Sequence, residues 1–116
     1  MITEDYVSSE TAKLLKEKGF DEPCFRHIKS KEIYESGDWY IGVPTLQMAM
    51  KWLREIHHCV ICITPLTFYC GEIVSKWGYC IWADDNTEVD EESSPRLESY
   101  EEACEAAIKY CLENLI

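Results

Sequence analysis

The sequence predicts an α+β fold: a two-layer sandwich in which about three helices cover one face of a small, mainly antiparallel sheet. Three observations predict it. Three segments carry apolar residues at the spacing of amphipathic helices. Between them lie short segments rich in β-branched and aromatic residues, separated by turn residues. The chain of 116 residues is long enough for one hydrophobic core, so residues 1–116 are expected to form a single domain.

The first helix is expected over residues 9–18. Ser8 or Ser9 can cap its N-terminus, because a serine hydroxyl accepts a hydrogen bond from a free backbone N–H of the first turn. Gly19 follows where a helix commonly ends in a left-handed residue, and Phe20 then folds back as in a Schellman motif.

Short strands are expected next. Residues 24–28 form one candidate. Residues 33–35 and 39–43 flank Ser36-Gly37-Asp38, a sequence typical of a hairpin turn.

The second helix has the clearest local pattern and is expected over residues 46–56. Pro44 suits a first helical turn, and Thr45 is a candidate cap. Met48 and Trp52 lie beside the main apolar face, one turn apart, and widen the apolar arc to roughly 200° at 100° per residue. The main apolar face consists of Leu46, Ala49, Met50, Leu53 and Ile56.

Residues 59–64 are apolar on both faces, which is typical of a buried central strand, and Pro65 is expected to end it. Residues 68–70 extend the sheet, and residues 77–83 form a further strand. In that strand one face holds Trp77, Tyr79 and Ile81, and the other holds Cys80 and Trp82.

Residues 84–98 are acidic and polar and are expected to form a loop, in which an edge strand is a second possibility. Ser99 then begins the last helix, where Ser99 and Glu102 form a capping box. Glu105 and Lys109 are spaced as an i,i+4 ion pair on the solvent face. The buried stripe is expected to contain Tyr100, Cys104, Ala107, Ile108, Cys111 and Leu115.

Charge and cysteine content restrict the class of protein. The formal net charge is −11, which argues against direct binding to nucleic acid or to anionic membranes. No segment reaches the roughly 20 apolar residues of a membrane span, and the N-terminus does not resemble a secretory signal. The seven cysteines are an odd number among apolar neighbours, so we expect reduced core thiols in a cytoplasmic protein.

Several segments together resemble a known group of proteins. They are the Ser9 to Phe20 opening, Pro44-Thr45-Leu46 running into Lys51-Trp52-Leu53-Arg54-Glu55, Trp77-Gly78-Tyr79, and Ser99-Tyr100-Glu101-Glu102-Ala103 with Glu105-Ala106. The chain resembles small uncharacterised proteins of gut Bacteroides, their phages and other mobile elements. The resemblance implies a small accessory protein that works inside a bacterial host cell, and it assigns no functional residue.

Two patterns invite a catalytic or metal-binding interpretation. Cys59-x-x-Cys62 has zinc-ligand spacing, but a strand points these two residues to opposite faces and no second ligand pair follows. His57, His58 and Cys59 form the alternative candidate, a small enzyme or ligand-binding site with a Cys/His pair. We find no phosphate loop, dinucleotide fingerprint or calcium loop, and we expect no cofactor.

Negative charge is concentrated near the end of the chain. Residues 84–116 hold 11 of the 22 acidic residues but 2 of the 11 basic ones, which is typical either of a solvated face or of a surface that steers a basic partner. Met48 and Trp52 either complete the core or remain outside as a contact for a partner or for a second copy of the chain. The sequence therefore favours a non-enzymatic protein–protein interaction module. Its candidate contact residues are Met48, Trp52, Asp84, Asp85, Glu88, Asp90, Glu91 and Glu92.

Overall fold

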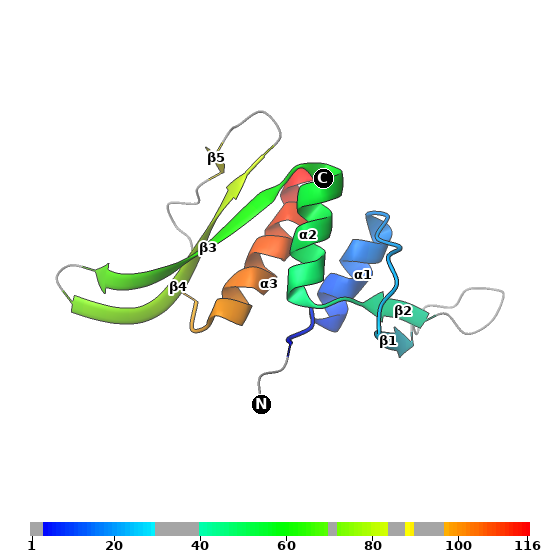
Figure 1. The fold of residues 1–116 in the computed structure, drawn as a ribbon, viewed down its shortest axis with the longest axis horizontal. Coiled ribbons are helices and arrows are strands. Elements are labelled where there is room, and N and C mark those ends of the chain that lie inside the picture. Colours follow the sequence, from blue (N-terminus) through cyan, green and yellow to red (C-terminus); the bar gives the residue numbers. More distant parts are fainter. Residues whose placement is uncertain (1–3, 30–39, 70–71, 84–87, 90–96) are drawn as a thin grey trace.

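A computed structural model of the chain describes residues 4–29, 40–69, 72–83, 88–89 and 97–116. It confirms the α+β class, the antiparallel pairing and the three helices (Figure 1). In chain order the elements are α1 (Ser9–Glu17), β1 (Arg26–Lys29), β2 (Tyr40–Val43), α2 (Leu46–His57), β3 (Val60–Tyr69), β4 (Glu72–Trp82), β5 (Glu88–Val89), α3 (Tyr100–Tyr110) and a π-helical turn, η1 (Cys111–Leu115).

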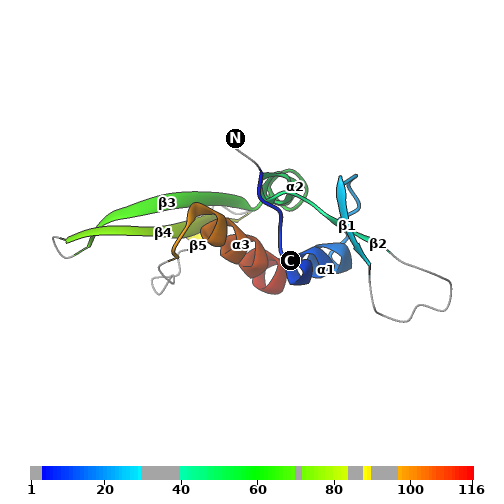
Figure 2. The ribbon, with the colours of Figure 1, turned by 90° about the horizontal axis from the view of Figure 1, so that it is seen from below.

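The described strands form two sheets instead of the single sheet expected. β1 pairs with β2 in one, and the other has the order β3-β4-β5. Figures 1 and 2 show the three helices between the two sheets, so they do not simply cover one face of one sheet. The expected hairpin at residues 36–38 and the strand at 33–35 lie outside the described residues, and β2 is paired with β1 from Arg26↔Val43 to Lys29↔Tyr40.

The strand predicted to be buried and central is an edge strand. Among the described strands β3 pairs with β4 alone, and it continues through Pro65 to Tyr69. Trp77, opposite Pro65, exchanges both backbone hydrogen bonds with Leu97, at 2.8 and 2.9 Å. Because these bonds point away from β3, Pro65 and Trp77 are a non-hydrogen-bonded pair, and the Pro65 nitrogen lies on the free edge. An edge strand therefore accommodates a proline that a central strand would not.

The two faces of β4 contain the residues predicted, and the face with Trp77, Tyr79 and Ile81 packs on the helices. Tyr79 and Ile81 are buried, and the Trp77 ring meets Tyr100 of α3 edge to face at 5.5 Å. The opposite face is open, since Trp82 remains 39% exposed.

Helix ends follow the expected chemistry. The Thr45 hydroxyl accepts from the Met48 N–H and caps α2. Gly19 has φ 97°, and the Phe20 N–H donates to the Leu15 carbonyl, which completes the Schellman motif. The core between the helices is formed by buried residues of every helix, including Leu15, Leu46, Ala49, Leu53, Cys104, Ala107, Ile108, Cys111 and Leu112.

Candidate functional site

The N-terminal segment is held against the start of α2 by backbone hydrogen bonds. The Val7 N–H donates to the Pro44 carbonyl at 3.1 Å, and the Leu46 N–H donates to the Asp5 carbonyl at 2.9 Å. The Arg26 guanidinium lies 4.0 Å from the centre of the Tyr6 ring and fixes this side chain toward β1. These contacts place residues 5–8 alongside α3, a segment almost the whole chain away in sequence.

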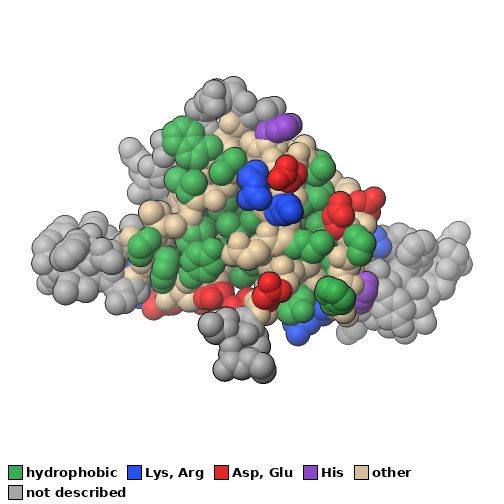
Figure 3. Space-filling view, in the orientation of Figure 1, with side chains coloured by type: hydrophobic (Ala, Val, Ile, Leu, Met, Phe, Trp, Pro, Cys, Tyr) green, Lys and Arg blue, Asp and Glu red, His purple; other side chains and the backbone are tan. Residues whose placement is uncertain are grey.

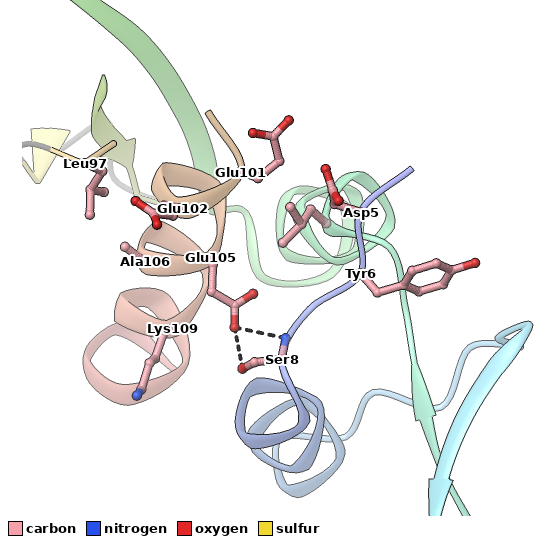
Figure 4. Close-up of a pocket in the computed structure, with 10 residues that line it drawn as sticks. Asp5, Tyr6, Ser8, Leu97, Glu101, Glu102, Glu105, Ala106 and Lys109 are labelled. Carbon is pink, nitrogen blue, oxygen red and sulfur yellow. Dashed lines mark hydrogen bonds between the residues drawn. The ribbon is translucent and has the colours of Figure 1, made fainter. Parts of the chain in front are cut away.

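An open groove of about 450 Å³ lies between this segment and α3 (Figure 4). Its apolar lining comes from Leu46, Leu97 and Ala106, which belong to three different parts of the chain. The remaining lining residues are Asp5, Tyr6, Ser8, Glu101, Glu102, Glu105 and Lys109.

The charged groups of the groove are mainly carboxylates. Asp5 contributes one from the N-terminal segment, and α3 contributes three from Glu101, Glu102 and Glu105, against the one ammonium group of Lys109. That ammonium is already engaged, because Lys109 Nζ lies 3.0 Å from Glu10 Oε1. The hydrogen bond that Lys109 donates to Glu10 raises the pKa of Lys109, and the Glu10 carboxylate compensates the charge of the ammonium. The groove therefore presents negative charge around an apolar floor.

Glu105 has a role that the helical pattern did not predict. Its Oε1 accepts hydrogen bonds from the Ser8 N–H at 3.1 Å, the Ser8 hydroxyl at 2.5 Å and the Thr11 hydroxyl at 2.5 Å. The expected Glu105–Lys109 pair is replaced by this contact and by the Lys109–Glu10 pair. A carboxylate of α3 thus caps the N-terminus of α1, where the helix dipole favours negative charge.

Of the other three groove carboxylates, that of Glu102 is engaged, whereas those of Asp5 and Glu101 remain available to a ligand. Glu102 accepts from the Glu98 N–H at 3.0 Å, one residue before the position that a standard capping box would use. Among the described residues, the carboxylates of Asp5 and Glu101 have no hydrogen-bond or ion-pair partner. A smaller hollow of about 190 Å³ shares Asp5 and Glu101 with the groove and adds Glu4. The negative surface thus continues toward the start of α2.

Met48 and Trp52, predicted from sequence as partner contacts, both line a separate depression of about 240 Å³ on α2. Trp52 itself is a core residue, because its ring packs edge to face on Phe20 at 5.3 Å and leaves 7% of the residue exposed. Ile56, assigned from sequence to the buried face, is 57% exposed. It lies in the last turn of α2, one residue before the end of the helix at His57.

The acidic residues predicted as contacts lie mostly outside the described residues. Asp84, Asp85, Asp90, Glu91 and Glu92 belong to segments that the structure does not describe. The backbone of Glu88 lies in β5, opposite Trp82, so an edge strand does occupy part of the expected loop. The groove carboxylates were missed because an exposed helical glutamate has the same pattern whether or not another segment packs beside it.

The residues of the Cys/His alternative, His57, His58 and Cys59, lie at the end of α2. The Cys59 thiol is buried and donates to the His57 carbonyl at 3.6 Å, while the His57 ring packs on Trp52 at 4.6 Å. His58 ends α2 in the left-handed conformation, with φ 56°. Burial, with added repulsion from Cys59, raises the pKa of Cys111 to about 12, so this neighbouring thiol stays protonated. In the part of the chain that the structure describes, no group of three potential metal ligands comes together.

Comparison of the chain with family models, with curated proteins and with solved structures finds no match. No helix in the described ranges has the length and apolarity of a membrane span.

Proposed function

We propose that the chain is a non-enzymatic protein-binding module that engages a basic partner through the groove between the N-terminal segment and α3. The observation that carries the proposal is the lining of this groove, in which carboxylates from two distant segments surround an apolar floor. Such a surface suits a peptide segment that presents an apolar side chain flanked by lysine or arginine.

The proposal is supported by the division of the groove carboxylates into those that make structural hydrogen bonds and those that do not. Glu102 and Glu105 hold the fold together through backbone and hydroxyl hydrogen bonds. Asp5 and Glu101 are not needed for those contacts, and both are exposed. These two can therefore exchange water for a cationic side chain without disturbing the helix caps.

The cellular setting is part of the same proposal. The resemblance to small proteins of Bacteroides phages and mobile elements favours an accessory role in the cytoplasm of a bacterial host. A protein that normally holds nucleic acid is a suitable kind of partner, because its lysine and arginine residues already recognise arrays of negative charge.

A labelled synthetic peptide of alternating lysine and leucine residues provides a direct test. We expect it to bind at low salt and to be released as salt is raised, and we expect the matching glutamate–leucine peptide not to bind. The paired substitution Asp5→Asn with Glu101→Gln should weaken binding by roughly tenfold, about 1.4 kcal/mol. Its matched control is Glu17→Gln with Glu113→Gln, which makes the same charge change at exposed positions outside the groove.

The outcome distinguishes a site from a general charge effect. Weakening confined to the groove pair supports the proposal. Equal weakening by the control pair would show attraction to overall charge only, and absence of binding at low salt would remove the proposal altogether.

A further inference from the structure

Exposed apolar residues collect at one end of α2. Among the described residues, the large hydrophobic side chains that remain exposed are Phe25, Ile56, Val60 and Trp82. Three of these four lie where α2 passes into β3 and on the strand paired with it, since Val60 is directly opposite Trp82. Phe25 lies just before β1 and does not line the depression on α2. Burying such a group of side chains is favourable, so the junction of α2 and β3 is a candidate contact surface.

The exposed face of α2 also carries both signs of charge. Lys51 and Glu55 lie one turn apart and line the same depression as Met48 and Ile56. Among the described residues Lys51 has no ion-pair partner, and Glu55 has only the distant contact of 3.9 Å with Arg54. Figure 3 shows positive and negative side chains next to one another over α2, bordered by hydrophobic side chains.

This pattern is self-complementary. A two-fold axis places the helices of two copies antiparallel and brings the same flank of each together, so residue i of one copy faces residue j of the other. An axis at Trp52 brings Met48 opposite Ile56, because each lies four residues from it. An axis one residue further brings Lys51 opposite Glu55. The two axis positions differ by one residue, so aligning one pair leaves the other about 3 Å out of register along the helix, which long side chains can absorb.

We propose that this face of α2, with the adjoining Ile56, Val60 and Trp82, is the interface of a homodimer. A partner of a single charge would leave Lys51 or Glu55 opposed by a like charge, whereas a second copy satisfies both. The lining of the depression shares no residue with the acidic groove, so separate substitutions test the dimer and the proposed function.

Sedimentation of the whole chain from micromolar to millimolar concentration tests the dimer. We expect a species of twice the 13.5 kDa chain mass, dissociating on dilution. Ile56→Asp should raise the dissociation constant by roughly tenfold or more, because each interface loses two apolar contacts. Phe25→Asp is the control and should leave the constant unchanged, since Phe25 is also an exposed apolar residue but does not line the depression.

Charge exchange gives the second, more specific test. Lys51→Glu alone and Glu55→Lys alone each place like charges opposite one another, so each variant should be monomeric where the unchanged chain is dimeric. Mixed together, the two variants restore both ion pairs and should form a heterodimer, which an effect within one helix cannot produce. Circular dichroism confirms that each variant is folded.

Three results would overturn the proposal. They are a monomer at every concentration, a dimer that persists in Ile56→Asp and Lys51→Glu, and a mixture of the charge variants that stays monomeric. The second would place the contact on another face.

Discussion

Replacing Glu105 by alanine should destabilise the fold far more than an exposed helical glutamate normally does. One carboxylate oxygen accepts three hydrogen bonds, two of them from Ser8 and one from the hydroxyl of Thr11, a residue that is completely buried. Hydrogen bonds to a charged group contribute about 1.5–3 kcal/mol each, but bonds that share one acceptor are not additive, and Ser8 is exposed to water. We therefore expect a loss of about 3 kcal/mol, a large part of the ~5–15 kcal/mol by which domains are stable.

Urea denaturation followed by circular dichroism measures this loss as a change in midpoint at constant slope. Glu105→Gln keeps the acceptor oxygen and removes the charge, so it should fall about halfway between the wild type and Glu105→Ala. Glu113→Ala is the matched control, because Glu113 is exposed and follows on the same helical segment. It should change stability by less than about 0.5 kcal/mol.

A double-mutant cycle shows whether the loss comes from the contact with α1. Thr11→Val removes the hydroxyl with little change of shape, and its coupling to Glu105→Ala should reach about 1 kcal/mol. A Glu105→Ala variant as stable as its control, or a coupling energy near zero, would refute the conclusion that Glu105 joins α3 to α1.

Three further predictions concern stability. Gly19→Ala should lower the free energy of unfolding by about 1 kcal/mol, because the Gly19 backbone is left-handed. A Cβ there meets no atom within 4 Å, so no steric clash adds to this cost. Denaturant titration measures the loss, and an unchanged midpoint would contradict the prediction. Trp52→Ala should lower the free energy of unfolding by about 3–5 kcal/mol, because Trp52 is buried. Ile56→Ala should lower it by less than about 1 kcal/mol, because Ile56 is exposed, although the sequence placed it on the main apolar face. The folded-state pKa of Cys111, about 12, lies above that of an unfolded thiol. The stability that the protonated thiol contributes is therefore complete at neutral pH and is lost as pH rises. Between about pH 8 and pH 10, wild type should therefore lose about 1.5 kcal/mol more than Cys111→Ala, and equal losses in the two proteins would exclude this origin.

Local features of the fold were predictable because they depend on neighbouring residues. The Ser8, Thr45 and Ser99 caps and the Gly19 ending each need only a few consecutive positions. The alternation along β4 was likewise correct, since it depends only on the two-residue repeat of a strand.

The features that failed depend on distant contacts. β3 was expected to be central because it is apolar on both faces, but apolar composition does not reveal how many neighbours a strand has. Trp52 and Ile56 exchanged roles because Phe20, which belongs to another segment, packs on the indole ring. The groove was not predictable, because it exists only where the N-terminal segment meets α3.

The Pro65 nitrogen on the open side of β3 has a consequence for how the protein behaves in concentrated solution. An incoming strand needs an unbroken row of N–H donors along the edge it joins, and this row is interrupted in the middle of the ten-residue strand. Addition of a further strand on that side is therefore disfavoured, and Pro65→Val would restore the donor at an exposed position outside the core.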